Sequence, residues 1–195
     1  TLLYVDLINQ SLEAGAQTMD ALLDDFEARL YDQARQARQN WQEERQQMAA
    51  TVPTPFTSAL MHGCIARGQD LLVGMDFHHP SLFERGFTNA VNALAAIHDA
   101  LGKGEASGMR HSTDSQNHEP DASPLQAIAR AVHANFPNEA LHARLRAAPK
   151  WGNDDPCADR WAIELLERRE RALKRVDAEF GQPPHTVCHV VRSLH

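Results

Sequence analysis

Cysteine is scarce in this sequence, and its spacing argues against the common cysteine-based scaffolds. The 195 residues contain three cysteines, Cys64, Cys157 and Cys188, and none belongs to a C-x-x-C pair. An odd number of widely separated cysteines favours neither a disulfide framework nor a zinc knuckle. Because free thiols persist in reducing compartments, we expect a cytoplasmic location.

Positive charge and long apolar runs are also in short supply. Lysine and arginine number 19 against 26 acidic residues, which gives a net charge of −7 with histidine neutral. This balance argues against a nucleic-acid partner. No apolar run approaches the roughly 20 residues that span a bilayer. Residues Thr1 to Gln10 carry no basic segment, so we expect neither a signal peptide nor a membrane partner.

The two ends of the sequence look like cuts within a longer protein. The chain opens on Thr1-Leu2-Leu3-Tyr4 without a methionine, and it closes on Val187 to His195 with no turn after that apolar stretch. A length of 195 residues suits one domain or a piece of one. We therefore expect an internal fragment in which residues 1–195 form part of a single domain.

Apolar residues at helical spacing occupy most of the chain. Thr18, Ser123 and Asn138 are suited to helix N-caps because their side-chain oxygens can accept a free backbone N–H. In the helix predicted over residues 57–68, the apolar side chains expected to point into the core are those of Leu60, Met61, Cys64 and Ile65. The helices predicted from these signals cover residues 2–15, 19–48, 57–68, 86–101, 125–135, 138–147 and 155–180.

The remaining segments predict little sheet. Residues 69–85 show no clear period and are expected to be irregular. The stretch from about 102 to 123 is polar and has almost no large apolar residue, so we expect a mobile loop there. Residues 186–194 alternate as a strand does. The predicted fold class is mainly α with one or two strands.

Two phrases of the sequence are more specific than any helix pattern. Pro55 to Asp70 reads PFTSALMHGCIARGQD, and Pro149 to Pro156 reads PKWGNDDP. In this order they resemble the pyruvate formate-lyase-like domain of glycyl radical enzymes, and the resemblance covers roughly residues 1–180. The form of Lys150 to Asp155 is more similar to the dehydratase and lyase branches. The resemblance implies an internal fragment of an α/β barrel.

The sequence departs from the family's pattern in two places. Val73 to His78 stands where the family usually has Gly-Gly-Ala-x-Tyr-Asn, so that Gly74 is kept while Met75 and His78 differ. Asn92 stands where the family usually has an aspartate. These departures leave open whether the parent enzyme is active.

The resemblance also implies chemistry that this chain does not carry by itself. Such enzymes store a radical on a backbone glycine in an Arg-Val-Ser/Ala-Gly-Tyr/Phe type motif and pass it to a cysteine in a Gly-Cys-x-Glu type loop. The first motif is absent from the sequence. The implied partners are the rest of the parent chain, a second copy of the parent in a homodimer, and a radical S-adenosylmethionine activating enzyme that installs the glycyl radical. The isolated chain is expected to be inactive and to bind no cofactor.

The chemically capable side chains have simpler structural interpretations. Gly63-Cys64-Ile65-Ala66 imitates the cysteine loop, but Ala66 stands in place of the glutamate, so Cys64 is expected to be a small buried residue. Asp154 and Asp155 form a carboxylate pair, yet they precede Pro156 at the start of a long helix, where N-capping explains them.

The histidine pairs do not form a recognisable metal motif. His78 and His79 lack a third ligand at metal-binding spacing. His185 and His189 are four residues apart, but the local pattern is strand-like. They therefore do not form the i, i+4 pair that one face of a helix would place side by side. No catalytic, cofactor-binding or metal-binding residue is therefore predicted in this chain.

Three functions remain open from the sequence. The preferred one is a fragment of a glycyl radical lyase or dehydratase that acts by thiyl-radical hydrogen abstraction on a small organic substrate. The alternatives are pyruvate formate-lyase proper, which is an acyl transferase, and a degenerate helical module that binds another subunit without catalysis. The substrate cannot be read from these residues.

Overall fold

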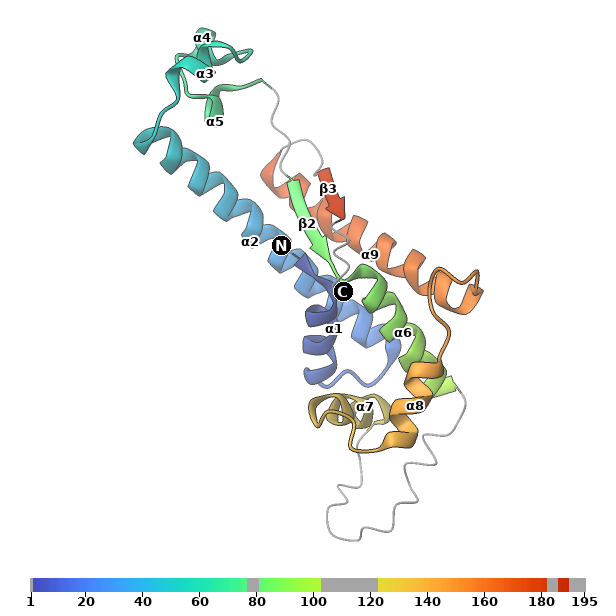
Figure 1. Ribbon diagram of the computed structural model, residues 1–195. Coiled ribbons are helices and arrows are strands. Elements are labelled where there is room, and N and C mark those ends of the chain that lie inside the picture. Colours follow the sequence, from blue (N-terminus) through green and yellow to red (C-terminus); the bar gives the residue numbers. More distant parts are fainter. Residues whose placement is uncertain (1, 77–80, 103–122, 182–185, 190–195) are drawn as a thin grey trace.

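Helices dominate the computed structural model, which describes residues 2–76, 81–102, 123–181 and 186–189 (Figure 1). The mainly helical fold class is confirmed. No helix in these ranges is both long and apolar enough to cross a membrane. The strands are β1 (Leu2–Leu3), β2 (Ser81–Arg85) and β3 (Thr186–His189), and the helices are α1 (Tyr4–Glu13), α2 (Met19–Thr51), α3 (Pro55–Ala59), α4 (Cys64–Arg67), α5 (Leu71–Gly74), α6 (Phe87–Gly102), α7 (Pro124–His133), α8 (Glu139–Ala147) and α9 (Pro156–Phe180).

The three strands form one parallel sheet with β2 in the centre. Strand β1 pairs with one edge of β2, placing Leu2 opposite Glu84 and Leu3 opposite Arg85. Strand β3 pairs with the other edge, placing Phe83 opposite Cys188. The segments between successive strands contain the helices, as parallel pairing requires a long crossover.

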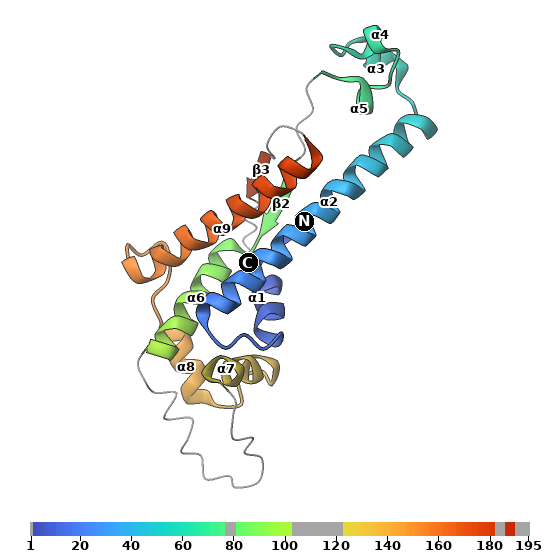
Figure 2. The same cartoon turned by 180° about the vertical axis from the view of Figure 1, so that it is seen from behind.

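The sheet has one covered face and one open face. Leu2, Leu82 and Glu84 are buried, whereas Leu3 is 41% and Phe83 48% exposed. Because successive residues of a strand point to opposite faces, the buried set shares the face that the helices cover. Helices α2 and α9 lie on that side in both views (Figures 1 and 2).

The hydrophobic core joins α1, α2, α6 and α9. Tyr4 is fully buried, and its ring centroid lies 5.8 Å from that of Phe26 and 5.6 Å from that of Phe87. This one ring of α1 therefore packs against two other helices, α2 and α6. Leu94 of α6 and Leu165 of α9 are also fully buried, and truncating such a leucine to alanine typically costs about 2–5 kcal/mol.

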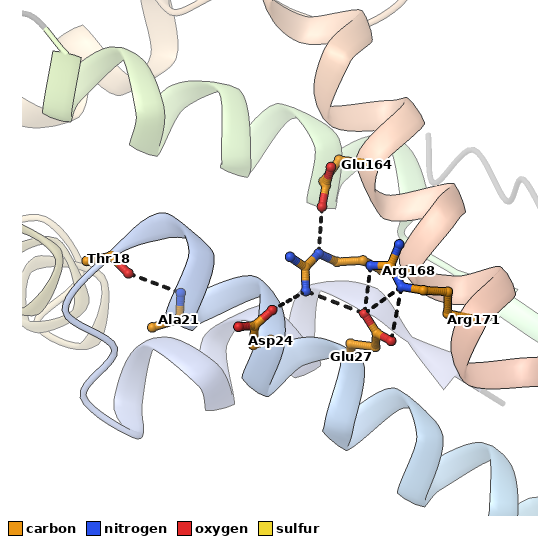
Figure 3. A network of polar contacts seen from close by, with 7 residues as sticks. All are labelled: Thr18, Ala21, Asp24, Glu27, Glu164, Arg168 and Arg171. Carbon is orange, nitrogen blue, oxygen red and sulfur yellow. Dashed lines mark hydrogen bonds and ion pairs between the residues drawn. The ribbon is translucent and has the colours of Figure 1, made fainter. Parts of the chain in front are cut away.

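A network of ion pairs joins α2 to α9 beside this core (Figure 3). Arg168 donates to Asp24 at 2.6 Å, to Glu27 at 3.4 Å and, within its own helix, to Glu164 at 2.7 Å. Burial disfavours the charge of Arg168, but the bonds to Asp24 and Glu164 outweigh it and raise the pKa of this guanidinium. Arg171 adds a 2.8 Å contact to Glu27.

The predicted N-caps are confirmed at three helices. Thr18 accepts a hydrogen bond from the backbone N–H of Ala21, which Figure 3 also shows, and Asn138 accepts one from Leu141. Ser123 and Gln126 form a reciprocal capping box. These caps fix where α2, α7 and α8 begin.

Helix α2 extends well beyond the body of the molecule and carries α3, α4 and α5 at its far end (Figures 1 and 2). At the 1.5 Å rise of an α-helix, its 33 residues span about 50 Å. The Arg45 guanidinium stacks on the Trp41 ring and also donates to the carbonyl oxygen of Leu72, which anchors α5 to α2. Residues 48–76 are referred to below as the tip.

Two strands lie where the sequence predicted other structure. Leu2 and Leu3 were assigned to a helix, but they form β1, and the helix begins at Tyr4. Residues 69–85 were expected to be irregular, but they contain α5 and the central strand β2. Both strands are stabilised by pairing with segments that are distant in the sequence. Local periodicity gives no information about such pairing.

The expected helix over residues 57–68 is also wrong in detail. Two short helices replace it, and the first begins at Pro55, two residues earlier than predicted. Of the four residues expected to point inward, only Cys64 is buried; Leu60 and Ile65 are 70% and 73% exposed.

Other predictions lie wholly or partly outside the described residues. The strand expected over 186–194 is confirmed at Thr186–His189, and residues 190–194 are not described. The loop expected at about 102–123 falls almost entirely on residues 103–122, which are not described either.

Candidate functional site

A charged residue occupies the covered face of the central strand. The side chain of Glu84 in β2 is fully buried. The Nη1 atom of Arg169 in α9 lies 3.4 Å from its Oε2 atom. A buried carboxylate is stable only when paired and hydrogen-bonded. The pair therefore couples the sheet to α9 near the carboxyl end of β2.

Tyr4 completes this buried cluster. Burial, and next the negative charge of Glu84, raise the pKa of the Tyr4 hydroxyl well above its ordinary value. Tyr4 thus stays a neutral phenol beside the Glu84–Arg169 pair. Because Glu84 lies on the covered face, this cluster holds the sheet in place and does not reach the open face.

The Pro55–Asp70 phrase is explained by hydrogen bonds to one carboxylate in the tip. The Oδ2 of Asp70 accepts from the backbone N–H of Thr54 at 2.6 Å, from its hydroxyl at 3.0 Å, and from the Ser58 hydroxyl at 3.1 Å. The Oδ1 accepts from the N–H of Leu72 at 3.0 Å and caps α5. The bonds from Leu72 and Thr54 lower the pKa of Asp70 to about 2, so it is ionised at neutral pH.

A second carboxylate fastens the other side of the tip. Asp76 pairs with Arg67 and with His62, and these contacts lower the pKa of the Asp76 carboxyl, that of Arg67 contributing most. Arg67 also donates to the carbonyl oxygen of Gly74 at 2.8 Å. A Cβ on Gly74 would lie 2.8 Å from the Cβ of Gln69, which accounts for glycine at this position.

The Lys150–Pro156 phrase is a structural turn. The backbone N–H of Trp151 donates to the Oδ1 of Asn92 at 2.8 Å, and the Trp151 ring packs edge-on against Phe87 at 5.4 Å. Lys150 donates to the carbonyl oxygens of Leu145 and Ala148. The phrase therefore seats the start of α9 against α6.

Asp155, rather than Asp154, is the N-cap of α9. Its Oδ1 accepts from the backbone N–H of Cys157 at 2.9 Å, and Pro156 occupies the first helical position. Asp154 adopts the left-handed conformation with a φ of 55°. The structural interpretation of this carboxylate pair agrees with these contacts.

The sequence candidates that the structure describes do not assemble into a catalytic group. Cys64 is buried in the tip, as expected. His78, His79 and His185 lie outside the described residues, and so does the side chain of His189. Among the residues that the structure describes, no group of three or more histidine, cysteine or acidic side chains could hold a metal ion.

The open face of the sheet is a feature that the sequence did not indicate. Leu3, Phe83 and Arg85 lie on it, and each is exposed. Arg85 follows the buried Glu84 directly, so their side chains diverge to opposite faces. The alternation in Leu82–Phe83–Glu84–Arg85 carries this signal, but it is too short to be recognised without the pairing strands.

The comparisons with known proteins agree with the resemblance found in the sequence. One solved structure with a similar fold is the glycerol-bound form of the B12-independent glycerol dehydratase from Clostridium butyricum, with a TM-score of 0.65 at 16% identity. The alignment covers 96% of this chain and 24% of that chain, so this chain spans about a quarter of the length of that enzyme. The family model described as pyruvate formate lyase-like matches residues 7–193, nearly the whole sequence. The chain therefore belongs to the pyruvate formate lyase-like family.

Proposed function

We propose that this chain forms one section of the barrel wall in a glycyl radical lyase or dehydratase. The observation that carries the proposal is the parallel sheet with helices on one face and Leu3, Phe83 and Arg85 on the other. Parallel sheets are almost always covered on both faces. In the complete enzyme the open face would then line the barrel interior, where the substrate is held.

The chain's own residues would act in binding and exclusion rather than in radical chemistry. The side chains of Leu3 and Phe83 would exclude water from the interior, and the Arg85 guanidinium would interact with polar groups there. Helices α2 and α9 shield the outer face of the sheet. The glycine and cysteine of the radical pathway would come from other parts of the enzyme, and an activating enzyme would install the glycyl radical.

Two observations support the lyase or dehydratase branch over the alternatives. The Lys150–Asp155 phrase has the form typical of that branch. Asn92, which departs from the usual aspartate, still supplies an oxygen that accepts a hydrogen bond from Trp151. A degenerate module is therefore not required to explain this departure.

The decisive experiment is to recover the complete coding sequence and express the protein anaerobically with a radical S-adenosylmethionine activating enzyme. We expect a Gly-Cys-x-Glu loop upstream, a glycyl radical signal in electron paramagnetic resonance, and turnover of a small hydroxylated substrate. A Cys-Cys pair with coenzyme A-dependent turnover of pyruvate would instead identify the formate-lyase. A complete sequence with neither motif would leave only the non-catalytic module.

Variants of the complete enzyme test the position of this chain within it. Arg85→Ala and Phe83→Ala should lower turnover without lowering the melting temperature. Lys174→Ala, on the exposed surface of α9, is the matched control and should change neither. Turnover by both sheet variants equal to that of the unmodified enzyme would contradict the interior location of the open face.

A further inference from the structure

A cavity opens between the last turns of α1 and α7. Helix α7 packs against α1 at the end of the molecule remote from the tip, as both views show (Figures 1 and 2). The cavity has a volume of about 240 Å³. Its lining comes from both helices and consists of Asn9, Leu12, Glu13, Ala129, Val132 and His133.

Half of this lining is apolar and half is polar. Leu12 is buried, and Ala129 and Val132 pack against the hydrophobic core, so these three side chains form a fixed wall. Within the described part of the chain, the side chains of Asn9, Glu13 and His133 make no hydrogen bond or ion pair. A cavity with an apolar wall and a few convergent polar groups is the usual form of a ligand site.

The electrostatics of the cavity favour a cation. Helix α1 ends at Glu13 and α7 ends at His133, so the cavity lies against the last turns of both helices. The carboxyl end of a helix carries a partial negative charge, and the effect is confined to that last turn. The Glu13 carboxylate adds a full negative charge beside them.

No arginine is among the described residues that line this cavity. Arg130 lies three residues before His133 in α7 and is exposed. Arg29 of α2 reaches the side chain of Gln10 at 3.4 Å, but its closest partner is Asp25. The negative charge of Glu13 is thus available to a cation that enters from solvent.

The polar lining matches the hydrogen-bonding capacity of a primary ammonium group. An ionised glutamate is an acceptor only, the side-chain carbonyl of asparagine accepts, and a neutral imidazole has one acceptor nitrogen. A primary ammonium group carries three N–H donors and no acceptor. The three polar side chains therefore offer one acceptor group for each donor, while the apolar wall suits the carbon atoms attached to the nitrogen.

We propose that this cavity binds a primary ammonium group on a short aliphatic chain, with the Glu13 carboxylate as its counter-ion. The volume lies below the roughly 300–1,000 Å³ of sites for drug-sized molecules, so the part of the ligand that enters is small. A free amine and a lysine side chain share this chemistry. The site does not depend on the proposed function of the chain, because it is built from α1 and α7 and not from the open face of the sheet.

Titration of the 195-residue chain with n-butylammonium, followed by nuclear magnetic resonance, tests the proposal. We expect saturable shifts of the backbone amide signals of Glu13 and His133, with a Kd on the order of 1 mM for so small a ligand. Tetramethylammonium has the same charge and the same number of non-hydrogen atoms but no N–H donor. Butan-1-ol also has that number of atoms but no charge. Both should bind at least roughly fivefold more weakly.

Variants separate the charge of the site from its shape. Glu13→Gln should raise the Kd for n-butylammonium by at least roughly fivefold, because it removes the counter-ion. Ala129→Leu should also weaken binding, since it narrows the cavity and leaves Glu13 in place. The matched control is Glu44→Gln, an exposed residue of α2 that does not line the cavity and should leave the Kd unchanged. Circular dichroism checks that each variant keeps its helices.

Nα-acetyl-lysine amide distinguishes the two sources of the ammonium group. Binding at least as tight as that of n-butylammonium would assign the site to a lysine side chain, and weaker binding would assign it to a free amine. The absence of saturable shifts at Glu13 and His133 would overturn the proposal. Equal binding of tetramethylammonium, or an unchanged Kd in Glu13→Gln, would overturn it as well, because neither the N–H donors nor the carboxylate would then be recognised.

Discussion

The backbone N–H of Trp151 and the Oδ1 of Asn92 form a 2.8 Å hydrogen bond between residues 59 positions apart. This bond seats the turn before α9 on the flank of α6. An amide oxygen and a carboxylate oxygen can both accept it. Either side chain at position 92 therefore supplies the acceptor that this bond requires.

Substitutions of Asn92 should therefore distinguish the effect of losing the hydrogen-bond acceptor from the effect of adding a negative charge. Asn92→Asp should change the free energy of unfolding by less than about 0.5 kcal/mol, and Asn92→Ala should lower it by about 1 kcal/mol through loss of the bond. Urea denaturation measures both. A larger loss for Asn92→Asp than for Asn92→Ala would show that the negative charge is not tolerated there.

Asp155→Ala should destabilise the chain by about 1 kcal/mol, because the Cys157 N–H loses its acceptor. Asp155→Asn should cost less, since asparagine also caps helices. Asp154→Asn is the matched control and should be nearly neutral, because asparagine tolerates the left-handed conformation. The same denaturation experiment ranks the three variants, and a greater loss for Asp154→Asn than for Asp155→Ala would reverse the assignment of the cap.

Arg168→Ala should cost roughly 2 kcal/mol, because it removes a guanidinium whose side chain is 10% exposed and which joins Asp24 of α2 to Glu164 of α9. Arg171→Ala removes a neighbouring pair whose guanidinium is 51% exposed, and it should cost less than about 1 kcal/mol. Thermal unfolding of both variants tests the contrast. Similar losses of stability in the two variants would mean that burial does not determine how much each arginine contributes to this network.

The Glu84–Arg169 pair should show strong coupling in a double-mutant cycle. Arg169→Met leaves the buried Glu84 without this cationic partner, and breaking a buried pair typically costs about 3–5 kcal/mol. Adding Glu84→Gln should recover part of that loss, because a neutral amide needs no counter-charge. Additive effects in chemical denaturation would mean that the two side chains do not depend on each other.

Acidification should destabilise the tip by protonating Asp70. Its pKa is about 2 in the folded chain, below the roughly 3.9 of an unfolded aspartate, so ionised Asp70 stabilises the fold above about pH 4. That contribution is lost as the pH falls from about 4 to about 2. Nuclear magnetic resonance should show the Thr54 and Leu72 amide signals shifting over this range. The shifts should be absent in Asp70→Asn; their persistence in that variant would assign them to another group.

Helix starts were the most predictable part of the fold. Thr18, Ser123 and Asn138 act within three residues of their own position, so local sequence contains the whole interaction. The structural role of Asp155 was predictable for the same reason, because Pro156 beside it marks the first turn of a helix.

The sheet and the exposed tip were not predictable from local pattern. Strand β2 is specified by partners near residue 2 and near residue 187, and its five residues give too few alternations to recognise. Leu60 and Ile65 were expected inside because apolar residues on a helix usually face a core. Sequence spacing shows which residues share a face, but it does not show whether anything covers that face.

The order of the strands along the chain also determines when the sheet can form during synthesis. The central strand ends at residue 85, but its partner β3 is the last described segment to be made. At about 5–20 residues per second, roughly 5–20 s pass between the translation of β2 and that of β3. Throughout that interval one edge of β2 is without its strand partner and could pair with another nascent chain. Slow translation of this region would therefore lengthen the period of greatest risk, and a chaperone that shields strand edges should raise the yield of folded protein.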